Sequence, residues 1–166
     1  GEQIDALSTQ TLAALTTLQM AALSPDQLNA LTTSDIAVLT SKQLAGLTSS
    51  QISGLETDRF TALGSGQVSA LSTSVIAALS QDQFTSLTTQ GLTGLNSRQI
   101  SALDINNLTV LDPSNFGVLS SVQVQGLSTA AIAALGVDQL LALKTTSLAA
   151  LSTAQLSAIN IDLFAS

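Results

Sequence analysis

A period of eight residues runs through the chain and constrains its fold more than any other feature. Leucine stands at Leu7 and at every eighth residue from there to Leu151, and Ile159 ends the series. A second apolar series follows five residues behind the first, from Leu12 to Phe164. No residue is inserted or deleted between repeats. A short period that is kept this strictly predicts a repeat protein, in which one small structural unit stacks on its neighbours.

Each octad carries a signal for the start of a helix. With the recurring leucine numbered as position 2, the consensus from position 1 to position 8 is A-L-(S/T)-(S/T)-x-Q-(L/I)-A. Serine or threonine at position 3 with glutamine at position 6 matches a capping box, in which each side chain satisfies a free backbone N–H. Pro25 and Pro113 both stand at position 4, the first helical residue, where a missing N–H costs nothing. The pattern therefore predicts one helix start per octad.

The predicted helices are too short to be stable alone. Each can run only from position 4 to position 1 of the next octad, about six residues, and helix nucleation is costly. We therefore expect an all-α solenoid, or superhelix, of about twenty short helices, one per eight-residue repeat. From Gln67 onwards glutamine recurs at position 6 with a 16-residue rhythm that slips once, which favours two helices per coil. We expect residues 1–166 to form a single repeat-array domain, a fragment of a longer protein.

Two other folds compete with this interpretation. In one continuous helix the apolar stripe would drift by about 80° per octad, and a cap would recur inside the helix. In a β-solenoid the alternating spacings of five and three would place the two apolar series on opposite faces of a strand, and alanine is a poor strand former. Both folds fit the octad less well than short helices do.

Composition argues against several classes of function. The net charge is −7 and only Lys42, Arg59, Arg98 and Lys144 are basic, whereas nucleic-acid binding needs clustered positive charge. The chain has no cysteine and no histidine, so a thiolate, a sulfur metal site and the usual general base are missing. We expect no enzyme and no catalytic, cofactor-binding or metal site. No run of about 18 apolar residues is present, so we expect no membrane span.

Several acidic and amide side chains are candidate site residues. At position 5, the second helical residue, negative charge is favoured by the helix dipole, which accounts for Asp26, Asp58, Asp82, Asp138 and Asp162 without a catalytic role. The stretch 104–115 offers oxygen ligands that suit calcium, at Asp104, Asn106, Asn107, Asp112, Ser114 and Asn115. Because Asp104 and Asp112 both occupy the cap position, capping is the preferred interpretation.

Other recurring side chains have structural explanations. The Ser/Thr rows at positions 3 and 4 could bind ice or sugar, but capping at position 3 and solvation at position 4 explain them. The phenylalanines all occupy position 7, in phase with the core: Phe60, Phe84, Phe116 and Phe164. Apolar residues at usually polar positions are Ile105, Val122, Val137, Ile161 and Leu163, and the last two with Phe164 suggest a C-terminal end that invites end-to-end association.

The octad, as in Ala22–Leu28 and Ala78–Phe84, resembles repeat arrays of very large bacterial secreted or surface proteins of the adhesin- or haemolysin-like kind. This resemblance implies an extracellular or cell-surface location and a scaffold or adhesive role. We expect a structural spacer segment, with the chain itself as a possible partner, end to end or side by side. The alternative is a binding module whose Ser/Thr/Gln face recognises a glycan, ice or another protein.

Overall fold

The computed structural model describes residues 9–160, and helices joined by short links make up this part of the chain. Within residues 9–160 there are nineteen helices and no strand, so the predicted all-α fold is confirmed. The chain divides into two compact units, Gly1–Gly94 and Leu95–Ser166. None of the described helices is long and apolar enough to cross a membrane.

Each octad of the described range contributes one helix. In the first unit these are α1 (Thr9–Ala13), α2 (Thr17–Ala21), α3 (Pro25–Asn29), α4 (Thr33–Val38), α5 (Ser41–Leu44), α6 (Ser49–Ser53), α7 (Thr57–Phe60), α8 (Ser65–Ala70), α9 (Thr73–Ala77), α10 (Gln81–Thr85) and α11 (Thr89–Thr93). In the second unit they are α12 (Ser97–Ser101), α13 (Ile105–Thr109), α14 (Pro113–Phe116), α15 (Ser121–Gln125), α16 (Thr129–Ala134), α17 (Val137–Ala142), α18 (Thr145–Leu148) and α19 (Thr153–Ala158).

The predicted caps account for where the helices begin. The residue at position 3 is extended, as at Thr16 with φ −75° and ψ 162°, and its side chain accepts a hydrogen bond from the backbone N–H of position 6. The glutamine at position 6 returns the bond by accepting from the N–H of position 3, as between Gln27 and Ser24. Pro25 and Pro113 are each the first residue of their helix. The helix phase predicted from the octad is therefore confirmed.

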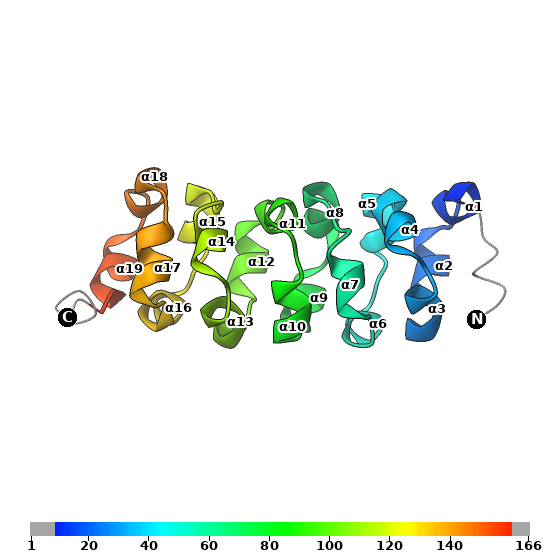
Figure 1. Ribbon diagram of the computed structural model, residues 1–166, viewed down its shortest axis with the longest axis horizontal. Coiled ribbons are helices and arrows are strands. Elements are labelled where there is room, and N and C mark those ends of the chain that lie inside the picture. Colours follow the sequence, from blue (N-terminus) through cyan, green and yellow to red (C-terminus); the bar gives the residue numbers. More distant parts are fainter. Residues whose placement is uncertain (1–8, 161–166) are drawn as a thin grey trace. The chain divides into compact units, whose positions relative to one another are not determined.

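The number of helices in a coil differs from the prediction. Helices three apart pack on each other, in the first unit as α2·α5·α8·α11, α3·α6·α9 and α1·α4·α7·α10 (Figure 1). The second unit repeats the arrangement in α12·α15·α18, α13·α16·α19 and α14·α17. One coil is therefore three octads, and the expected two helices per coil is wrong. The 16-residue rhythm of glutamine does not report the length of a coil. Position 6 is also filled by other residues, such as Val75 and Ala131, and these are buried as the glutamines are.

The core of each unit is built from positions 2 and 7. Leucines at position 2 are buried, for example Leu87 and Leu127. Phe60, Phe84 and Phe116 at position 7 are among the most deeply buried side chains, and Phe164 lies outside the described residues. The core therefore consists mainly of aliphatic side chains at these two positions, with few aromatic rings.

Some coils approach closely enough to require glycine at position 1. A Cβ on Gly54 would lie 2.7 Å from the Cβ of Pro25, which stands at position 4 three helices earlier. A Cβ on Gly46 would meet the Cγ2 of Thr17 at 2.5 Å in the same relation. These glycines have ordinary negative φ values, since no described glycine has a positive φ. Close packing, rather than an unusual turn, explains their presence.

The core assignment predicts unequal effects at two nearby sites. Leu87→Ala removes a buried leucine and should lower the free energy of unfolding by about 2–5 kcal/mol. Gln90→Ala, at an exposed position 5, should change it by less than about 0.5 kcal/mol. Urea unfolding followed by circular dichroism measures both, and equal losses would contradict the core assignment.

Candidate functional site

The most regular polar contact in the molecule is made by the glutamine at position 6. Gln83 is buried, and its Oε1 accepts from the backbone N–H of Ser80 at 3.0 Å, which completes the cap of its own helix. Its Nε2 donates to the carbonyl oxygens of Ile52 at 2.9 Å and Leu55 at 2.8 Å. These carbonyls belong to the end of α6 and the link after it, in the preceding coil. One side chain therefore joins a helix start in one coil to a helix end in another.

The same bridge recurs in both units. Donors that reach the carbonyls 31 and 28 residues earlier are Gln43, Gln51, Gln67, Gln139 and Gln155. The last carbonyls of a helix have no partner within it, and burial without one is costly. The side-chain amide satisfies them, so the stacking of coils depends on position 6.

The sequence contained a signal for this second role. Glutamate completes a capping box as well as glutamine does, yet position 6 carries no glutamate, and its one aspartate is Asp35 in α4. Of the two, only the amide of glutamine can accept from the cap and donate to a carbonyl at the same time, because an ionised carboxylate only accepts.

Position 4 also contributes to stacking, in contrast to the expectation that it is simply solvated. The hydroxyl of Ser41 donates to the carbonyl of Gly66 at 3.0 Å, and that of Ser49 to the carbonyl of Ser74 at 3.1 Å. In the second unit Ser121 donates to Thr146 at 3.1 Å. Part of the Ser/Thr row is therefore occupied by bonds between coils.

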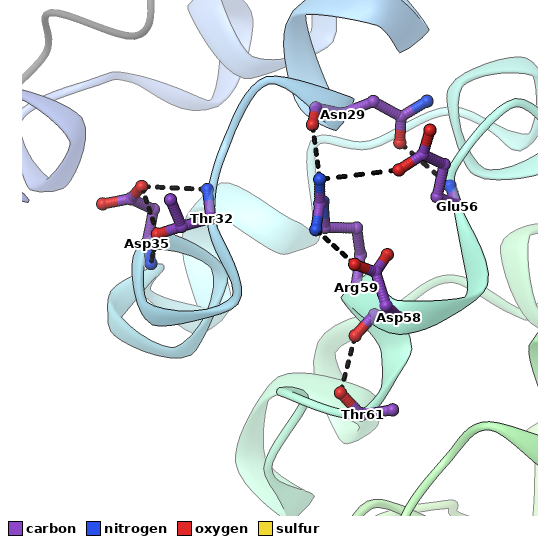
Figure 2. A network of polar contacts seen from close by, with 7 residues as sticks. All are labelled: Asn29, Thr32, Asp35, Glu56, Asp58, Arg59 and Thr61. Carbon is purple, nitrogen blue, oxygen red and sulfur yellow. Dashed lines mark hydrogen bonds and ion pairs between the residues drawn. The ribbon is translucent and has the colours of Figure 1, made fainter.

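One position 6 carries arginine instead of glutamine (Figure 2). The Arg59 guanidinium donates to the carbonyl of Asn29 at 2.6 Å, which places an Arg where glutamine bridges elsewhere. It also contacts Asp58 at 2.6 Å and Glu56 at 3.5 Å, and both carboxylates are largely exposed. The Asn29 side chain supports the joint by donating to the carbonyl of Gly54 and accepting from the N–H of Glu56. This cluster is a variant of the bridge between coils.

The acidic residues that are candidate ligands lie at helix starts. Asp104 accepts from the N–H of Asn106 and Asp112 from the N–H of Ser114, both at 2.8 Å, so both cap as expected. Asn107 is buried, while Ser114 is exposed and Asn115 half-buried. Asp26, Asp58, Asp82 and Asp138 are exposed at position 5, and Asp162 lies outside the described residues. In residues 9–160 no three acidic side chains gather to hold a metal ion, and no pocket is found.

The apolar departures from the octad are dispersed. Ile105 on α13 and Val122 on α15 are exposed, and Val137 on α17 is half-buried. Ile161 and Leu163 lie outside the described residues. The described departures do not form one apolar patch, since they lie on three different stacks of helices.

The bridge predicts different costs for the same substitution in different coils. Gln83→Ala removes the acceptor of the Ser80 N–H and the donor of two buried hydrogen bonds. It should lower the free energy of unfolding by about 2–4 kcal/mol. Gln19→Ala removes a capping glutamine that has no donor bond within residues 9–160, and should cost about 0.5–1 kcal/mol. Chemical denaturation of both variants at low protein concentration measures the difference. Equal losses would mean that the bonds between coils contribute nothing to stability.

The cap at α14 predicts a specific dependence on pH. Hydrogen bonds from the side chain and the backbone N–H of Ser114 lower the pKa of Asp112. The carboxylate therefore adds stability above its unfolded-state pKa, and this stability is lost as the pH falls through the folded-state pKa. The destabilisation caused by Asp112→Asn should be larger at neutral pH than in acid. In Ser114→Ala, NMR titration should show the Asp112 pKa moving back towards its ordinary value; no movement would contradict the assignment.

Comparison with known proteins supports the repeat array. A family model described as the ALTTAQ repeat matches residues 2–33, 32–65, 52–89 and 109–145, which together cover well over half of the chain. No curated protein matches the chain. With its consensus Ala-Leu-Ser/Thr-Ser/Thr-x-Gln and four matches along its length, the chain belongs to the ALTTAQ repeat family.

Proposed function

We propose that the chain is a structural spacer or scaffold segment of a large secreted or cell-surface protein. The observation that carries the proposal is that the recurring polar side chains of the chain form hydrogen bonds to neighbouring coils. The amides at position 6 and several hydroxyls at position 4 bond to neighbouring coils, as Gln67 and Ser41 do. An array whose regular chemistry joins coils to each other is suited to fixing a distance.

The proposed location rests on the resemblance of the octad to arrays of bacterial secreted and surface proteins. The absence of cysteine is compatible with that location. A catalytic role is not proposed, since the sequence has neither histidine nor cysteine to serve as base or nucleophile.

Recognition of a glycan, ice or a protein by the Ser/Thr/Gln face is the weaker candidate. Such a surface needs hydroxyls free to meet a ligand, whereas those of Ser41, Ser49 and Ser121 donate to carbonyls of the next coil. The exposed residues at position 5 differ from coil to coil along one stack, as Lys42, Gly66 and Gln90 do. A row of identical ligand contacts is therefore not formed there.

A spacer should lengthen by one step when one coil is added. We would insert a second copy of residues 40–63 after Leu63, which adds three octads and brings Gly46 and Gly54 of the copy over Ser41 and Ser49. The chain lacks cysteine, so spin labels can be placed on Leu18→Cys in α2 and Gln90→Cys in α11. The distance between the labels, measured by pulsed electron resonance, should grow by about 8–10 Å, one helix-packing distance.

A copy of residues 44–63 at the same place is the matched control, because it is nearly as long but breaks the octad. That variant should lose helix or aggregate. If it folds as well as the 24-residue insertion, or if the 24-residue insertion leaves the distance unchanged, the spacer proposal fails. Specific binding of the unmodified chain to a glycan array, abolished by alanine at exposed serines such as Ser34 and Ser50, would favour the binding module instead.

A further inference from the structure

Three departures from the octad lie on one stack of the second unit. Helices α12, α15 and α18 pack on each other in consecutive coils. They carry Arg98 at position 5, Val122 at position 5 and Lys144 at position 3, and all three residues are exposed, Val122 by 62%. The octads of these helices, 95–102, 119–126 and 143–150, contain no acidic residue. We name Arg98, Val122 and Lys144 the basic patch.

The fold of the second unit does not require the basic patch. Position 3 caps the helix in most octads, but Lys144 makes no side-chain cap hydrogen bond to α18. Val122 exposes an apolar side chain at a position that is usually polar, and α15 lies between α12 and α18, so this exposure does not depend on where the described coils end. The ion pairs of residues 9–160 both belong to Arg59, so neither Arg98 nor Lys144 has a carboxylate partner among these residues. The charge of the patch is therefore available to a partner.

The first unit presents the opposite charge on one of its own stacks. Helices α4, α7 and α10 pack on each other, and their octads carry Asp35, Glu56, Asp58 and Asp82. Asp35 is half-buried in the capping box of α4, and the other three are exposed. Arg59 is the one cation of these octads, and it is already paired with Glu56 and Asp58. We name the four carboxylates the acidic face, and negative charge remains in excess on it.

The basic patch and the acidic face match in spacing. Arg98 and Lys144 are two coils apart, with Val122 on the coil between them. Asp35 and Asp82 are also two coils apart, with α7 between them. Because each step from coil to coil is about 8–10 Å in both units, the two cations can meet two carboxylates at once. We infer that the basic patch of one copy of this chain binds the acidic face of a second copy, side by side.

A second copy fits the basic patch better than other acidic partners. Anionic membranes are recognised by clusters of about 4–8 Lys and Arg side chains, and nucleic acids by a basic stripe. The patch has two cations in a chain of net charge −7. A folded partner with carboxylates at the coil spacing suits two cations, and Val122 would lie against α7, where the exposed Thr57 and Thr61 offer methyl groups. This inference concerns the outer faces of two stacks and does not rest on the spacer role.

The first test reverses the charge of the basic patch. Arg98→Glu with Lys144→Glu exchanges two exposed cations for two anions. The control, Lys42→Glu with Ser50→Glu and Gln90→Glu, shifts the net charge by the same amount at exposed positions outside both surfaces. Sedimentation equilibrium of the full chain at low salt should show concentration-dependent association of the unmodified protein and of the control. The association constant of the patch variant should lie about tenfold or more below that of the control, with an unchanged circular dichroism spectrum.

A mixing experiment tests whether the two surfaces meet each other. Ser34→Lys, Asp35→Gln, Glu56→Ser and Asp82→Lys together make the acidic face positive, and the glutamine and serine are the consensus residues of their positions. The patch variant and the face variant should each be monomeric alone, because both surfaces of each then carry the same sign. An equimolar mixture should associate, because the negative patch of one variant meets the positive face of the other.

Three results would overturn the inference. They are an unmodified chain that stays monomeric at every concentration, a patch variant that associates as the control does, and a mixture that stays monomeric. Binding to phosphatidylserine vesicles by a chain that stays monomeric, lost in the patch variant, would assign the patch to a membrane instead.

Discussion

The side-chain amide at position 6 is the contact on which the stacking of this protein depends. A helix of five residues leaves most of its backbone groups without a partner inside the helix. Gln83 satisfies one at the start of its own helix and two at the end of α6 and the link that follows. A single buried side chain therefore supplies partners to both helices. The array is held together by contacts that no single octad can make.

The places where glutamine is replaced show which part of the bridge matters. Ser147 retains one donor bond, to the carbonyl of Leu119 at 3.0 Å, and Arg59 retains one to Asn29. Val75 and Ala131 fill the space with apolar atoms and give up the donors. Each unit therefore combines hydrogen-bonded contacts between coils with purely apolar contacts at position 6. Hydrogen-bonded contacts between coils are therefore distributed along each unit.

The sequence predicted what is local and missed what depends on the angle between helices. Caps such as Ser24 with Gln27 join residues three apart, so the octad alone reveals them and fixes the phase of every helix. The number of helices in a coil depends on how sharply the chain turns at the link, and no residue pattern within one octad specifies that turn. The donor role of glutamine was missed for the same reason, since its acceptors lie 28 and 31 residues away. Gly46 and Gly94, 48 residues apart in one stack, carried a weak signal for a coil of 24 residues.

The side-chain amide protons of Gln83 offer the most direct test of the three-helix coil. In nuclear Overhauser spectra they should contact protons of Ile52 and Leu55, and they should exchange slowly with solvent because both donors are buried and bonded. The same pattern should appear for Gln51 with Met20 and Leu23. Contacts from these amides to residues about two octads earlier, or rapid exchange with contacts only inside their own octad, would contradict the bridge and the coil built on it.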